Sequence, residues 1–250
     1  MSSGRGSVRV DRGTKRVRTY LRGQLVADTI SPWLVWEVPY YPAYYFPVAD
    51  VHAELLDEGA KPSHSPSRGD AQVRTVVTSA GRASGAALVY EDSPIEEIRG
   101  TVRLQWDEME AWFEEDEEVY THPRDPYTRV DILASTRRVQ VKVDGVTIAD
   151  STSPRMLFET GLPVRYYLPR TDLRMDLMQL TNTVTHCPYK GRAQTWGVRT
   201  GETLQPDLAW GYPAPLPESQ KIAGLVAFYN EKVDIIVDGV LQERPSTKFS

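Results

Sequence analysis

The chain is 250 residues long, with 40% apolar, 25% charged and 10% aromatic residues, a composition that is typical of a folded globular protein and excludes a disordered or collagen-like one. Its net charge of −5 and its pI near 5.5 argue against a nucleic-acid partner, because nucleic-acid binders usually carry a basic stripe and a high pI. The single cysteine, Cys187, excludes an internal disulfide, and no stretch of about 18 apolar residues is present to span a bilayer, so we expect a cytoplasmic protein without membrane contacts.

Alternating apolar and polar residues predict a β-hairpin near the start of the chain. Residues 17–27 form it, with a turn at Gly23, and residues 33–36 follow as a short apolar strand. Asp50 stands where a helix N-cap belongs, so we expect a short helix over residues 51–56.

The acidic run that follows has helical spacing. Met109, Trp112 and Phe113 fall on one predicted face, with acids on the other. We interpret residues 106–118 as a solvated helix, with a surface for a basic partner as the alternative. The run contains eight acids and no base: Asp107, Glu108, Glu110, Glu114, Glu115, Asp116, Glu117 and Glu118.

The second half of the chain repeats this plan. The expected elements are a hairpin over residues 139–149 with an Asp144-Gly145 turn, a strand over residues 156–158, a helix over residues 173–180 capped by Asp172, and strands over residues 224–229 and 233–241.

Internal self-similarity accounts for the shared plan. Residues 15–72 align with residues 137–194 at a constant offset of 122 and match at 18 of 58 positions, where chance would give about four. The retained pairs include Glu37/Glu159, Tyr44/Tyr166, Tyr45/Tyr167, Asp50/Asp172, His64/His186, Tyr90/Tyr212 and, at an offset of 124, Val102/Val226. The chain is therefore a tandem duplication.

These patterns predict a mainly β protein with short helices, built from two homologous modules packed about a pseudo-twofold axis. The first module covers residues 8–105, the acidic helix and connector residues 106–136, and the second module residues 137–243. Residues 1–7 and 244–250 are expected to be loose ends.

Distinctive segments are WLVWEVPYYPAYYFP at residues 33–47, HPRDPY at 122–127, THCPYKG at 185–191, AWGYP at 209–213 and IAGLVAFY at 222–229. With Trp106-Asp107 and the acidic run, they closely resemble the bacterial family called domain of unknown function 427, in its two-copy form. The resemblance implies a compact module similar to the two-sheet β-tent architecture, without an assigned activity.

The family is also labelled nucleotidyltransferase-like, but the chain has no Gly-Ser lead-in to an Asp-x-Asp pair, no phosphate-binding Gly-rich loop and no Walker lysine. The zinc sites of β-tent relatives use paired Cys-x-x-Cys motifs, which one cysteine cannot supply. We therefore expect neither a metal nor a cofactor.

Three residues are candidates for catalysis. His186 and Lys190 could activate the Cys187 thiol as a nucleophile, although neighbouring strand residues point to opposite faces, and packing is the alternative for Cys187. His186 lines a pocket or makes a structural hydrogen bond. Glu159, which is retained as Glu37 in the first copy, could act as a general base or bind a cation.

Aromatic residues with polar tips form the second candidate constellation, because they suit a wall for a flat ligand as well as core or interface packing. In the first copy they are Trp33, Trp36, Tyr40, Tyr41, Tyr44, Tyr45 and Phe46. For the second copy, which keeps more of the motif residues, we predict a ligand pocket formed by Tyr166, Tyr167, His186, Tyr189, Lys190, Trp196, Trp210 and Tyr212.

Three classes of function fit these features. A small-molecule-binding module comes first, because a histidine, aromatics and an acid recur in both copies without a complete catalytic set. The second is an enzyme, a transferase or hydrolase using His186 and Glu159. The third is a structural or interaction protein, and exposed tyrosines would also fit an interface in a homo-oligomer.

Overall fold

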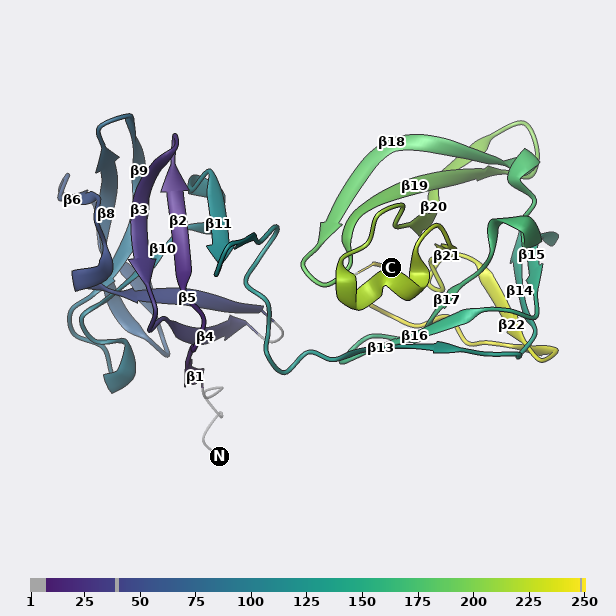
Figure 1. Cartoon of the computed structure of the whole chain (residues 1–250), viewed down its shortest axis with the longest axis horizontal. Coiled ribbons are helices and arrows are strands. Elements are labelled where there is room, and N and C mark those ends of the chain that lie inside the picture. Colours follow the sequence, from purple (N-terminus) through teal and green to yellow (C-terminus); the bar gives the residue numbers. More distant parts are fainter. Residues whose placement is uncertain (1–7, 39–40, 248) are drawn as a thin grey trace. The chain divides into compact units, whose positions relative to one another are not determined.

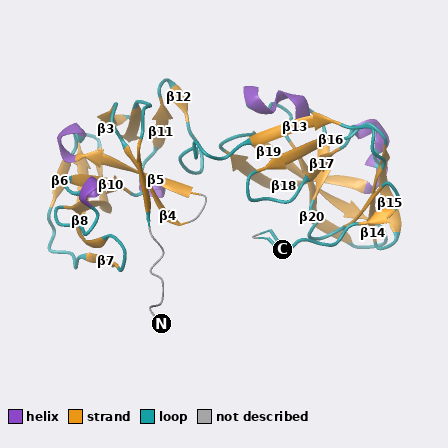
Figure 2. Cartoon of the chain, turned by 90° about the horizontal axis from the view of Figure 1, so that it is seen from below, coloured by secondary structure: helices purple, strands orange, loops and turns teal. Residues whose placement is uncertain are grey.

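The computed structural model describes residues 8–38, 41–247 and 249–250, which form two compact units that meet in sequence between Asp125 and Pro126 (Figure 1). Strands dominate both units, and the helical segments are short 3-10 turns (Figure 2). The prediction of a mainly β protein is therefore confirmed. Within the described residues, no helix is long and apolar enough to cross a membrane.

The first unit contains two antiparallel sheets. The larger has the spatial order β1 (Arg9–Arg12), β4 (Trp33–Val38), β5 (Tyr41–Pro47), β10 (Thr101–Leu104), β9 (Gly81–Tyr90), β8 (Gly69–Thr78) and β6 (Glu54–Leu56), and β7 (Ser63–Ser65) also pairs with β8. The smaller has the order β12 (Glu117–Glu118), β11 (Ala111–Glu114), β2 (Val17–Leu21) and β3 (Gln24–Thr29).

The second unit repeats this topology. Its larger sheet consists of β13 (Val130–Ala134), β16 (Arg155–Glu159) and β17 (Arg165–Tyr167), followed by β21 (Val226–Phe228), β20 (Leu204–Gly211), β19 (Gly191–Arg199) and β18 (Met178–Cys187). A bridge between Leu168 and Val226 joins its two parts, as the pair Phe46 and Val102 does in the first unit. The smaller sheet has the order β15 (Val146–Ser151), β14 (Val139–Val143), β22 (Asp234–Val237) and β23 (Val240–Leu241).

Both predicted hairpins at the start of the copies are confirmed. The turn residues Arg22 and Asp144 have φ of 49°, and Gly23 and Gly145 follow with φ of 72° and 80°. Two consecutive left-handed residues are what a type I′ turn requires, and glycine adopts this conformation without a steric penalty.

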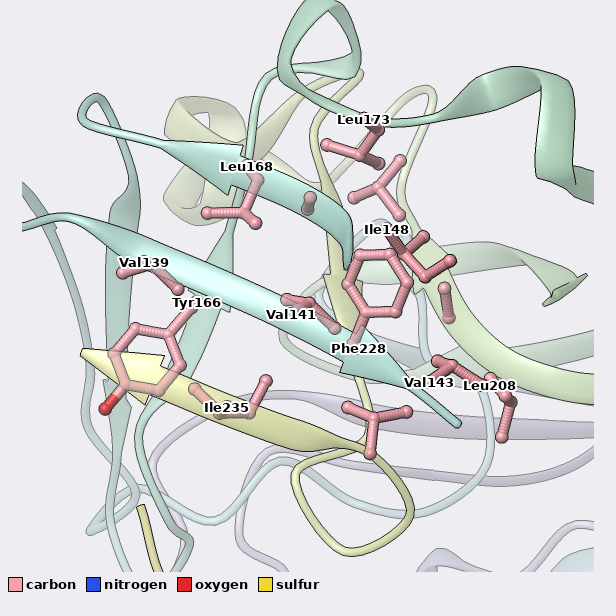
Figure 3. Close-up of a cluster of buried hydrophobic side chains, with 14 of the residues drawn as sticks. Val139, Val141, Val143, Ile148, Tyr166, Leu168, Leu173, Leu208, Phe228 and Ile235 are labelled. Carbon is pink, nitrogen blue, oxygen red and sulfur yellow. The ribbon is translucent and has the colours of Figure 1, made fainter. Parts of the chain in front are cut away.

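Each unit buries apolar side chains on both faces of its larger sheet. One core lies between the two sheets and, in the second unit, contains Val141 from β14 and Phe228 from β21 (Figure 3). A second cluster contains side chains from the opposite face of the larger sheet, which we call the outer face. Leu157 and Tyr167 belong to the outer-face cluster of the second unit.

The helix predicted for residues 106–118 is not confirmed. Trp106–Glu108 form one 3-10 turn (η3), and β11 then pairs with β2 as a strand of the smaller sheet. Trp112 is buried among core residues, whereas its neighbour Phe113 contacts the ring of Tyr20. The side chains therefore alternate with the period of a strand, not of a helix.

The two short helices after Asp50 and Asp172 are also not formed. Both acids end 3-10 turns, Val48–Asp50 (η1) and Arg170–Asp172 (η4). They accept hydrogen bonds of 2.6 Å from the hydroxyls of Thr29 and Ser151, so each acid ties its turn to the smaller sheet instead of capping a helix.

The C-terminal residues, predicted to be loose, contact the second unit. Arg244 forms an ion pair with Asp234, the Thr247 hydroxyl donates to Glu231 at 2.6 Å, and the Phe249 ring lies 6.2 Å from the ring of Tyr229. The predicted loose residues 1–7 lie outside the described residues.

Trp112→Ala is expected to lower the free energy of unfolding of the first unit by about 3–5 kcal/mol, because the side chain is a packed part of the core. Urea unfolding followed by circular dichroism measures this loss. Ile30→Ala, at a residue that is 74% exposed, serves as the control and should change the stability by less than about 0.5 kcal/mol. An equally small effect of Trp112→Ala would contradict its place in the core.

Candidate functional site

Strand alternation divides the predicted pocket residues of the second unit between two places. Tyr166 and Trp196 pack into the core between the sheets. Tyr167, Trp210 and Tyr212 lie in the outer-face cluster, where Cys187 packs against them. The eight predicted ligand residues therefore do not line one common pocket.

A buried ion pair joins the outer-face residues. The Lys190 ammonium, in the turn between β18 and β19, donates to the carboxylate of Glu159, the last residue of β16, at an Nζ–Oε2 distance of 2.5 Å. Their side chains are 9% and 10% exposed. Two ions withdrawn from water to this extent interact strongly, and each is costly to leave without the other.

Tyrosine and tryptophan side chains complete the cluster. Trp210 Nε1 donates a hydrogen bond of 3.1 Å to the Tyr167 hydroxyl. Burial raises the pKa of Tyr167 well above its usual value, and it does the same to the pKa of Tyr212, with nearby Tyr167, Cys187 and Glu159 adding to the effect. Both hydroxyls therefore stay protonated and can donate or accept hydrogen bonds.

His186 and Cys187 do not form a pair on one face. His186 is exposed and stands opposite Arg192 in the ladder, whereas Cys187 is half-buried against the outer-face cluster. Tyr189, the remaining predicted residue, is half-buried, and its carbonyl accepts a hydrogen bond from Ser219.

The first unit has an equivalent cluster around Glu37. The carboxylate accepts hydrogen bonds from the Tyr45 hydroxyl at 2.7 Å and from Arg103 Nε at 2.9 Å. Arg68 lies 3.7 Å from it and donates to the Tyr90 hydroxyl at 3.3 Å. Four of these five residues occupy the positions of Glu159, Tyr167, Lys190 and Tyr212 in the repeat, so the cluster is duplicated.

Sequence reasoning missed the two arginines and a second buried ion pair. Arg68 could have been predicted from the sequence, because it aligns with Lys190 in the repeat. Arg165 and Glu231, 6% and 0% exposed, form a bidentate pair with distances of 2.7 and 2.6 Å, next to the outer-face cluster. The Arg165 guanidinium lies 5.5 Å from the Trp210 ring.

Residues of the first unit line two recesses. One, of about 160 Å³, is lined by residues that include Glu37, Tyr41, Arg103, Trp106, Trp112 and His122. The other, of about 240 Å³, is lined by residues that include Trp106, Asp107, Glu110, Glu118 and Tyr120. Tyr40, predicted as part of the first aromatic set, lies outside the described residues, among which no group of three potential metal ligands is found.

The fold and the site define a duplicated β protein, in which each copy has two packed sheets and a carboxylate–cation cluster on the outer face of the larger one. The family model described as Domain of unknown function (DUF427) matches residues 9–115 and 131–239. The chain belongs to this family, with two tandem copies of the domain. The first match includes β11, in agreement with its place in the first unit. No curated protein matches the chain.

Breaking the Glu159–Lys190 pair is expected to destabilise the second unit more than removing both charges. Lys190→Met should lower the free energy of unfolding by about 3 kcal/mol, because it leaves a buried carboxylate without its partner. The double variant Glu159→Gln/Lys190→Met should recover part of this loss in urea unfolding. Arg174→Met, in an exposed pair with Asp176, is the control and should have little effect. A strictly additive double variant would contradict the coupling.

The buried tyrosines predict a loss of stability at alkaline pH. Burial raises the pKa of Tyr45, Tyr167 and Tyr212 above the usual value of 10.0. Their contribution is complete below pH 10 and decreases as the pH rises above it, because only the unfolded chain ionises them readily. Absorbance of tyrosinate and circular dichroism, recorded together, should show these groups ionising only as the chain unfolds, and Tyr167→Phe should reduce the alkaline loss. Full ionisation of a folded chain would refute this.

Proposed function

We propose that the second unit binds a small polar molecule at its outer-face cluster, with Glu159 and Lys190 as the polar contacts. The observation that carries this proposal is the duplication of the cluster. Its acid and tyrosines are identical in both copies, although 40 of the 58 aligned positions differ. A buried ion pair is a weak source of stability, since an apolar pair of similar volume often does as well. Stability alone is therefore a poor reason for keeping it twice.

The chemistry of the cluster favours a planar molecule with a hydrogen-bond donor next to an acceptor. Glu159 can accept from such a ligand, and Lys190 has two further N–H groups beyond the one directed at Glu159. Within the described residues, the Tyr212 hydroxyl makes no hydrogen bond. Cys187 and Tyr229 are half-buried and pack against the cluster, and we propose that a ligand enters beside them.

An enzyme that uses His186 and Glu159 is the second candidate, and the geometry supports it less. His186 is exposed on the edge strand β18, whereas Glu159 is buried and bonded to Lys190. A nucleophilic Cys187 would have to rely on Tyr167, Tyr212 or Lys190 in place of the histidine. Cys187→Ser separates these alternatives, because an enzyme that uses this nucleophile would lose turnover with binding intact, whereas a binding module would be unchanged.

Native mass spectrometry of gently purified full-length protein tests the proposal. The wild-type chain is expected to retain a bound small molecule, which liquid chromatography and mass spectrometry would identify after denaturation. Glu159→Gln and Lys190→Met should lose it, with folding checked by circular dichroism. Lys142→Met, on the smaller sheet, is the matched control and should retain it. A molecule retained equally by all variants, or none in wild type, would argue against this site.

A further inference from the structure

The polar cluster of the first unit contains one more positive charge than negative charge. Arg68 and Arg103 both approach the single carboxylate of Glu37, and the side chains of the three residues are 16%, 20% and 17% exposed. Within the described residues, no second acid lies within 4.0 Å of either guanidinium. A partly buried cation without a counterion is unfavourable, which makes the cluster a natural place for an anion.

The second copy shows that this excess is particular to the first. Lys190 replaces Arg68, and the position of Arg103 is occupied by Ala227, which follows the bridge residue Val226 as Arg103 follows Val102. One lysine therefore balances Glu159 there, while two arginines face Glu37. The added charge comes from a single residue of β10.

Arg103 is also the residue that connects the cluster to a cavity. The lining of the recess of about 160 Å³ includes Arg103 and Glu37 together with aromatic residues. Trp106 and Trp112, which stack with centroids 4.6 Å apart, form part of this lining. A cavity of about 150 Å³ accommodates a benzene ring. The recess therefore has the size for one ring.

The hydrogen bonds of Arg103 leave capacity for a ligand. Its Nε and Nη2 atoms donate to Glu37 at 2.9 and 3.3 Å, and Nη1 donates to Gln105. A guanidinium has five N–H donors, so two N–H groups remain beyond these three bonds. Glu37 already accepts from Tyr45 and Arg103 and orients the guanidinium by its fixed position on β4.

We propose that this recess binds a small aromatic carboxylate, with its carboxylate on Arg103 and its ring against the tryptophan wall. A carboxylate matches the planar donors of arginine better than a neutral group does, and it supplies the missing negative charge. The site is separate from the one proposed for the second unit and does not depend on it.

A fluorine NMR titration of the full chain with 4-fluorobenzoate tests this site. The probe should show a saturable shift, and the neutral isostere 4-fluorobenzamide should bind at least about tenfold more weakly, the scale of one charge-assisted hydrogen bond. This comparison uses the wild-type protein and requires no variant. Equal binding of the two probes, or no saturation by 4-fluorobenzoate up to its solubility, would overturn the proposal.

Variants then locate the site. Arg103→Gln should weaken 4-fluorobenzoate binding by about tenfold or more, and Arg103→Lys, which keeps the charge, should lose less. Arg82→Gln, at an exposed arginine paired with Glu58, is the matched control and should bind as wild type does. Binding that persists in a folded Arg103→Gln variant would place the anion elsewhere and refute this site.

Discussion

The larger sheet of each unit packs an apolar cluster on each of its two faces, and the rest of the structure depends on this constraint. Because neighbouring strand residues point to opposite faces, Tyr166 packs between the sheets while Tyr167 lies in the outer-face cluster. The same alternation carries a carboxylate to the outer face at the end of β4 and of β16. A carboxylate withdrawn from water needs a cation, so the ion-paired clusters follow from the pleat of the sheet.

The smaller sheets of the two units keep equivalent hydrogen bonds at positions where the two copies differ in sequence. The backbone N–H of Arg16 donates to the Glu115 carboxylate at 2.8 Å, and that of Arg138 donates to the Asp238 carboxylate at 2.9 Å. Glu115 and Asp238 have φ of 49° and 51°, so both begin the same kind of turn. Both copies therefore retain a carboxylate acceptor and a left-handed backbone conformation at this position, whereas the length of the side chain differs.

Hairpins, tandem copies and strand content could be predicted from the sequence because they depend on local turn chemistry and on identities between the copies. The acidic strand β11 could not, since the spacing of Met109 and Trp112 fits a helix as well as a strand that follows a 3-10 turn. An alignment of β11 with β22 would have indicated a strand. Glu114 in β11 pairs with Val17 as Val237 in β22 pairs with Val139. The site was predictable only in part. The repeat identified Glu159 and Tyr167. That Tyr167 and Tyr166 lie on opposite faces of the sheet could be seen only in the structure.

The two clusters differ in their cations, while the acid is the same. Glu37 and Glu159 hold equivalent places, but Arg68 and Arg103 surround the first and Lys190 alone contacts the second. An arginine has a planar set of hydrogen-bond donors, whereas a lysine has a compact ammonium group. The two sites therefore present different donor geometries to a ligand, next to the same glutamate acceptor. Tyr45, which donates a hydrogen bond to the acid in the first unit, is fully buried and cannot vary without disturbing the sheet. The cations lie nearer the surface, so they are the residues through which the two copies could acquire different ligands while keeping one fold.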